Sequence, residues 1–103
     1  MRWKTLFSRG TTPTEALTLG IARISPGDAL AEHRHAEPEI YLVLDGVATV
    51  TVGDDEWQLE PGAAIFIPGN AVHGCRNGEA TELRFAYAFA TDSFEIVEYD
   101  FGD

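Results

Sequence analysis

The chain has 103 residues, of which 45% are hydrophobic, and its formal net charge at pH 7 is −10. This length suits a single domain over residues 1–103, and the apolar fraction is enough for a core, which excludes a disordered chain. The excess of acidic side chains argues against polyanionic partners, so we expect neither nucleic acid nor a membrane surface as a partner.

The chain contains one cysteine, Cys75, which excludes an intrachain disulfide and a cysteine-based zinc finger. Residues 1–7 lack the continuous apolar stretch of a signal peptide. No window reaches the roughly 18 apolar residues that a membrane span needs. We therefore expect a cytoplasmic protein.

Apolar and polar residues alternate with period two, and Gly, Pro and Asp interrupt the alternation at short intervals, which predicts short strands. In chain order we expect strands near residues 4–8, 17–25, 30–35, 39–44, 47–52, 56–60, 64–67, 71–76, 82–90 and 94–101. Only Thr14–Leu19 has some helical character, and it is short. About ten short strands indicate a β-sandwich or a closed barrel, and periodicity does not separate the two.

The three histidines of the chain lie in two short segments that carry the candidate ligands. His33 and His35 are two residues apart, so on a strand both side chains point to the same face. Glu39 shares their parity and faces the same way if the strand continues through residues 36–38, although Pro is unfavourable inside a central strand. His73 follows a Pro-Gly-Asn turn.

Three imidazoles and a carboxylate on one concave surface suit a divalent first-row metal ion with coordination positions left open, as a catalytic site requires. Fe, Mn, Zn, Ni and Cu all accept such a set, so the sequence predicts one transition metal ion without naming it.

The spacing of these residues resembles the two sequence motifs of the cupin superfamily. Segment 27–46 has the pattern Gly27-x5-His33-x-His35-x3-Glu39-x6-Gly46, and segment 62–77 has Gly62-x5-Pro68 followed by His73-x3-Asn77. The one departure is Asn70 in place of a glycine, and asparagine tolerates the left-handed conformation well enough for the turn to form. The two motifs and their spacer cover about half of the chain.

This resemblance implies an all-β chain folded as a double-stranded β-helix, the jelly-roll barrel of the cupins, which is usually a homodimer. It also implies that the metal lies inside the barrel and is held by His33, His35, Glu39 and His73. The expected partner is then a small molecule bound in the barrel.

Other residues are expected to form the wall around this site. Tyr41 lies two positions beyond Glu39, and it is either a core tyrosine or an acid/base group whose pKa the metal would lower. The odd positions of segment 83–89 are largely aromatic and are expected to line the barrel, with Trp57 contributing from the other sheet. Such a stripe is either core or a wall that holds a cationic ligand through cation–π contacts.

Three further features have simple interpretations. Cys75 shares the parity of His73 and is either a buried, inert thiol or a neighbour of the metal. Leu42 and Leu44 have the opposite parity from the ligands, so we expect a second subunit to cover the outer face of their strand. Segment Ser93–Phe101 is expected to be a final strand or a dimer arm.

The fold does not fix the reaction, and three classes of function stay open. The phrases at 38–41 and 67–74 resemble the cupin dimethylsulfoniopropionate lyases, which form dimethyl sulfide and acrylate. That resemblance implies that Tyr41 removes the proton α to the substrate carboxylate. The same ligands also suit a dioxygenase with iron, or an isomerase with zinc or manganese. The third class is a non-catalytic module that binds a small ligand through the metal.

Overall fold

The computed structural model describes residues 1–7 and 17–89 of the chain. Within these ranges the chain forms nine strands and no helix, so it contains no helix that could cross a membrane. The strands are β1 (Arg2–Phe7), β2 (Thr18–Ile24), β3 (Ala29–His33), β4 (Glu39–Asp45), β5 (Ala48–Val52), β6 (Asp55–Leu59), β7 (Ala64–Ile67), β8 (His73–Arg76) and β9 (Leu83–Phe89).

Each of these strands overlaps one of the first nine strands predicted from the sequence. The tenth prediction, at 94–101, lies outside the described residues, as does the first half of Thr14–Leu19. Thr18 and Leu19 belong to β2, so the helical character expected there gives way to a strand. Pairing with β9 explains this result, because tertiary context overrides a weak local propensity.

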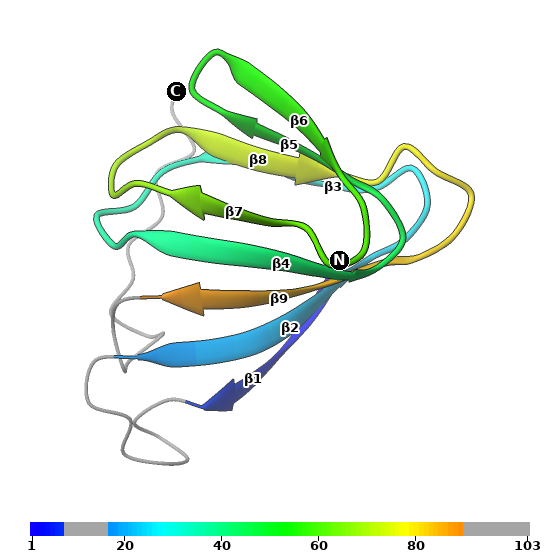
Figure 1. Ribbon diagram of the computed structural model, residues 1–103, viewed down its shortest axis with the longest axis horizontal. Coiled ribbons are helices and arrows are strands. Elements are labelled where there is room, and N and C mark those ends of the chain that lie inside the picture. Colours follow the sequence, from blue (N-terminus) through cyan, green and yellow to red (C-terminus); the bar gives the residue numbers. More distant parts are fainter. Residues whose placement is uncertain (8–16, 90–103) are drawn as a thin grey trace.

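The described strands form two antiparallel sheets that face each other (Figure 1). The larger sheet has the order β1-β2-β9-β4-β7, and the smaller sheet has the order β3-β8-β5-β6. The chain passes repeatedly between the sheets, so most spatial neighbours are distant in sequence. This arrangement confirms the predicted all-β jelly-roll fold.

The core lies between the two sheets and alternates along each strand. In β9 the side chains of Leu83, Phe85, Tyr87 and Phe89 point inward and are no more than 5% exposed. Two rows of cross-strand neighbours face this interior from the larger sheet: Thr5, Gly20, Tyr87 and Tyr41 in one row, and Trp3, Ala22, Phe85 and Val43 in the next. Leu42 points outward, as its parity predicts, and is 38% exposed.

The segment between His33 and Glu39 is not a continuous strand. β3 ends at His33, residues 36–37 form a bend, and β4 begins at Glu39 in the opposite sheet. Pro38 lies at this crossing, where its missing N–H removes nothing from a ladder. The strand does not continue through residues 36–38, so Glu39 does not share a strand face with His33 and His35. It faces the histidines across the barrel instead.

The turn at 68–70 connects β7 to β8 and lies against the segment that carries His35. Asn70 has a φ of 66°, in the left-handed region, so the expected tolerance of asparagine at this position is confirmed. Its backbone N–H donates to the carbonyl oxygen of His35 over 2.7 Å. Gly69 packs against the Ala36 carbonyl oxygen, where a Cβ atom would clash. The turn therefore fixes the backbone beside His35.

Candidate metal centre and cavity

The structure brings the four predicted ligands to one point between the sheets. His33 on β3 and His73 on β8 are register partners, His35 follows β3, and Glu39 begins β4. All four side chains are buried, with no more than 5% of each residue exposed. The ring centroids of the histidines lie 4.4 to 5.7 Å apart, and one nitrogen of each lies within 4.8 Å of the others. The three histidines could therefore hold a metal ion.

Each imidazole is oriented by a backbone carbonyl two residues away. The Nδ1 atoms of His33, His35 and His73 lie 2.7, 2.8 and 2.9 Å from the carbonyl oxygens of residues 31, 37 and 71. A carbonyl oxygen only accepts hydrogen bonds, so each Nδ1 must carry the proton. In the neutral ring this leaves the Nε2 lone pair available, which is the form in which histidine binds metals.

The carboxylate of Glu39 lies against two of these nitrogens. Its Oε1 atom is 3.2 Å from Nε2 of His35 and 3.2 Å from Nε2 of His73. If the rings are neutral, both Nε2 atoms and the carboxylate oxygen are hydrogen-bond acceptors. Their close approach in a buried site is unfavourable unless a proton or a cation lies among them. The donor set therefore fits a divalent metal ion.

The pKa values of two histidines reflect the same environment. Burial lowers the pKa of His33, and the neighbouring imidazoles of His73 and His35 lower it further. Burial also opposes the charged form of His35, but the hydrogen bond and negative charge of Glu39 outweigh it and raise the pKa of that ring. The pKa shifts of these two rings are therefore opposite in direction, and the contact with Glu39 is the cause of the difference.

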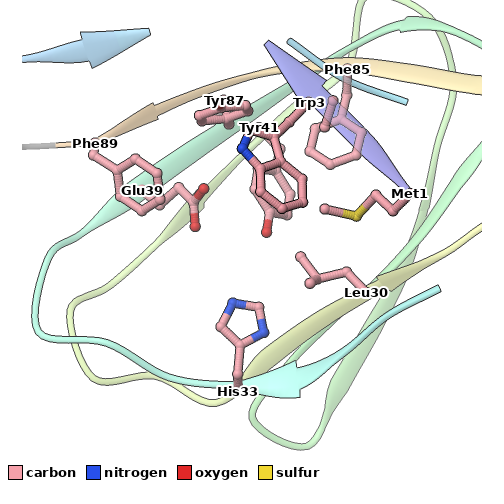
Figure 2. Close-up of a pocket in the computed structure, with 10 residues that line it drawn as sticks. Met1, Trp3, Leu30, His33, Glu39, Tyr41, Phe85, Tyr87 and Phe89 are labelled. Carbon is pink, nitrogen blue, oxygen red and sulfur yellow. The ribbon is translucent and has the colours of Figure 1, made fainter. Parts of the chain in front are cut away.

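A cavity of about 270 Å³ extends from this point between the sheets (Figure 2). Its wall is formed by Met1, Trp3, Ala22, Leu30, His33, Glu39, Tyr41, Phe85, Tyr87 and Phe89. This size lies near the lower end of the range for small-molecule sites, so the cavity suits a small ligand. The predicted aromatic stripe of β9 does line it.

Tyr41 lies in the wall of this cavity, close to the histidines. It is 2% exposed, its ring centroid is 6.2 Å from that of His73, and Figure 2 shows its hydroxyl pointing into the cavity. Its ring also packs against Phe85, with 4.7 Å between centroids. The phenol thus has both of the environments that the sequence left open, a packed ring and a polar end that faces the site.

A second tyrosine, Tyr87, lines the cavity beside Tyr41 but is held differently. Its hydroxyl lies 3.1 Å from Oγ1 of Thr5, and its ring passes over Gly20, where a Cβ atom would clash with it. Burial raises the pKa of Tyr87, and the hydrogen bond with Thr5 acts in the opposite direction. Tyr87 therefore keeps its phenolic proton more firmly than a free tyrosine does.

Two expectations about the wall have different outcomes. Cys75 is a buried thiol, 3% exposed, and burial followed by the charge of Glu39 raises its pKa to about 12. The expectation that Trp57 lines the same cavity is wrong. β6 is an edge strand, so Trp57 is 43% exposed and lines a separate cavity of about 240 Å³ between β6 and β7.

Sequence reasoning missed Trp3, which enters the cavity wall from the edge strand β1. Its register partner is Ala22, whose side chain faces the interior, so Trp3 points to the same side of the larger sheet. The sequence shows that Trp3 and Thr5, two residues apart, share a face of any strand that they form. Only the pairing of β1 with β2 reveals which face that is.

Comparisons with known proteins agree with this architecture. Residues 20–89 match the Cupin_2 family, described as a cupin domain. The chain is 44% identical over 101 residues to dimethylsulfoniopropionate lyase DddW of Ruegeria pomeroyi, a match that covers 98% of this chain and 66% of that protein. It is also 28% identical over 57 residues to the uncharacterised protein SCO3923 of Streptomyces coelicolor, covering 55% of this chain and 54% of that protein.

Among solved structures, a cupin 2 domain-containing protein from Halorhodospira halophila superposes with a TM-score of 0.88 at 24% identity, over 99% of this chain and 69% of that one. The protein TT1209 from Thermus thermophilus superposes with a TM-score of 0.74 at 28% identity, over 87% of this chain and 84% of that one. Family, fold and motif spacing agree, and the chain belongs to the cupin family.

Proposed function

We propose that this chain is a metal-dependent lyase that cleaves dimethylsulfoniopropionate into dimethyl sulfide and acrylate. The observation that carries the proposal is the 44% identity, over 98% of the chain, to a protein named as a lyase of this substrate. That relative is longer, and this chain spans 66% of its length. The proposal therefore rests on residues of the shared part.

His33, His35, Glu39 and His73 are the proposed ligands of one divalent metal ion. Their burial, the Nδ1 protons held by carbonyls, and the contact of Glu39 with two Nε2 atoms support this assignment. When bound, the ion would supply positive charge for the substrate carboxylate and for the negative charge that develops there as the α proton leaves. Fe, Mn, Zn and Ni all accept three imidazoles and a carboxylate.

Tyr41 is the proposed base, acting as its phenolate. Its oxygen takes the proton from the carbon next to the substrate carboxylate, and the electrons of that C–H bond form the double bond of acrylate. The bond between the β carbon and sulfur breaks, and its electron pair leaves with dimethyl sulfide. The proton remains on the Tyr41 oxygen until it is passed to solvent, so the sum is one substrate giving acrylate, dimethyl sulfide and a proton.

The test is direct. The purified chain is loaded with Fe(II), Mn(II) or Zn(II) in turn, the sulfonium substrate is added, and dimethyl sulfide is measured by gas chromatography. The proposal expects release with at least one metal and none after chelation. Oxygen uptake is followed in the same samples. If no metal supported release of dimethyl sulfide and oxygen were consumed with other substrates, a dioxygenase would be favoured instead.

A further inference from the structure

The cavity has one polar end and a long apolar wall. Among the residues that the structure describes, its lining contains no lysine or arginine, and Glu39 is the one acidic side chain. Met1 also lines the cavity, and its N-terminal ammonium is paired with Asp28 over 2.9 Å. An anionic group of a ligand would therefore find its charged partner at a metal ion held by the histidines and Glu39. Glu39 is itself a proposed metal ligand, so its carboxylate would not be left for a cationic group of the ligand.

Aromatic rings make up much of the remaining wall. Five residues supply them: Trp3, Tyr41, Phe85, Tyr87 and Phe89. The face of such a ring attracts a methylated cation, and tryptophan does so most strongly. A ligand with a carboxylate at one end and a methylated cation at the other therefore matches this cavity in both of its parts.

Trp3 has the position best suited to the cationic end. It lies in the inward row with Ala22 and Phe85 but on the edge strand β1, and it is 57% exposed, so its indole borders the cavity at its rim. Figure 2 shows Trp3 and Met1 on the cavity side of β1, with Met1 on the side of Trp3 away from Glu39. A metal ion held by the buried histidines and Glu39 would repel a ligand cation, which favours the exposed rim at Trp3 for the cationic end.

We infer that Trp3 is a specificity-determining residue that binds the methylated cationic end of a zwitterionic carboxylate. The ligand class includes quaternary ammonium compounds as well as sulfonium compounds, since a ring face responds to charge and methyl groups rather than to the central atom. The inference rests on the proposed function only for the end of the ligand that meets the metal.

The experiment compares two ligands of the same shape that differ in charge. One is β-alanine betaine, and the other is its carbon analogue, in which a tert-butyl group replaces trimethylammonium. Binding of each to the metal-loaded chain is measured by titration calorimetry. We expect the betaine to bind about 3- to 30-fold more tightly, the range that a cation–π contact provides.

Substitutions at Trp3 locate the effect. Trp3→Leu should remove most of the difference between the two ligands, and Trp3→Phe should keep part of it, because a ring face remains. Loss of apolar contact weakens both ligands alike, so the ratio of their affinities reports the charge alone. Trp57→Leu is the matched control, since this partly exposed tryptophan lines the other cavity, and it should leave the ratio unchanged.

Equal affinity of the two ligands for the unsubstituted chain, or no binding of the betaine, would overturn the inference. A ratio that survives in Trp3→Leu would also overturn it. Trp3 lies on an exposed edge strand, so its variants should fold, and circular dichroism checks that they do. Because binding is read without turnover, a chain that binds the betaine selectively yet releases no dimethyl sulfide would refute the proposed reaction and leave this inference standing.

Discussion

The two sheets contribute different chemistry to the same site. The smaller sheet and the segment that follows β3 supply the three imidazoles, whereas the larger sheet supplies a carboxylate, a phenol and the aromatic rings. The groups suited to holding a metal thus come mainly from one side of the barrel, and those suited to facing a substrate come mainly from the other. This division means that substitutions in each sheet should affect different measurements.

The largest effect is expected from removing an imidazole of the smaller sheet. His73→Ala should lower metal affinity by more than the roughly 10- to 100-fold that loss of an outer hydrogen-bond partner of a ligand costs, because a ligand itself is lost. Metal content after gel filtration is the measurement. Cys75→Ala is the matched control, because Cys75 lies on the same strand and is also buried. A normal metal content in His73→Ala would contradict the ligand assignment.

In the larger sheet, Tyr41→Phe should lower kcat by about 100- to 10,000-fold, the usual contribution of an acid/base group. Metal content should stay unchanged, since the phenol is not among the proposed ligands. Tyr87→Phe is the control from the neighbouring position. It loses the hydrogen bond with Thr5, worth about 1 kcal/mol of stability, and should keep its turnover. If the two variants were equally active, Tyr41 would be a core residue.

A smaller effect, on stability, is expected at Gly20, which lies under the ring of Tyr87 in the cavity wall. Gly20→Ala places a Cβ atom against the ring of Tyr87 and 2.8 Å from the Lys4 carbonyl oxygen, so it should destabilise the fold by about 1–3 kcal/mol in urea denaturation. In a Tyr87→Leu background the same change should cost less, because the ring is gone. An equal cost in both backgrounds would mean that Tyr87 does not require the glycine.

The smallest effect concerns the thiol of the smaller sheet. The pKa of Cys75 is raised from 9.0 to about 12, so labelling by a thiol reagent should stay slow in the folded chain as the pH passes 9, and should be fast in guanidinium chloride. Because the unfolded chain loses this proton first, the free energy of unfolding should decline as the pH rises above 9. Rapid labelling of the folded chain would show that the thiol is accessible.

Much of the fold follows from local sequence pattern. The alternation along 83–89 and the turn residues between strands predicted nine of the observed strands, because each signal depends on nearby residues only. The ligand spacing predicted which four side chains meet. The crossing at 36–38 was not predicted, since the assignment of a strand to one sheet or the other depends on long-range pairing. The separate positions of Trp3 and Trp57 depend on the same pairing.

The carbonyl groups that orient the three imidazoles belong to the backbone, at positions 31, 37 and 71. Many metal sites use a side-chain carboxylate for this task, and a single mutation can remove it. Here a change of side chain at Ala31, Glu37 or Ala71 leaves the accepting oxygen in place. The orientation of the histidines therefore depends on the course of the backbone at these positions and not on the identity of the three side chains.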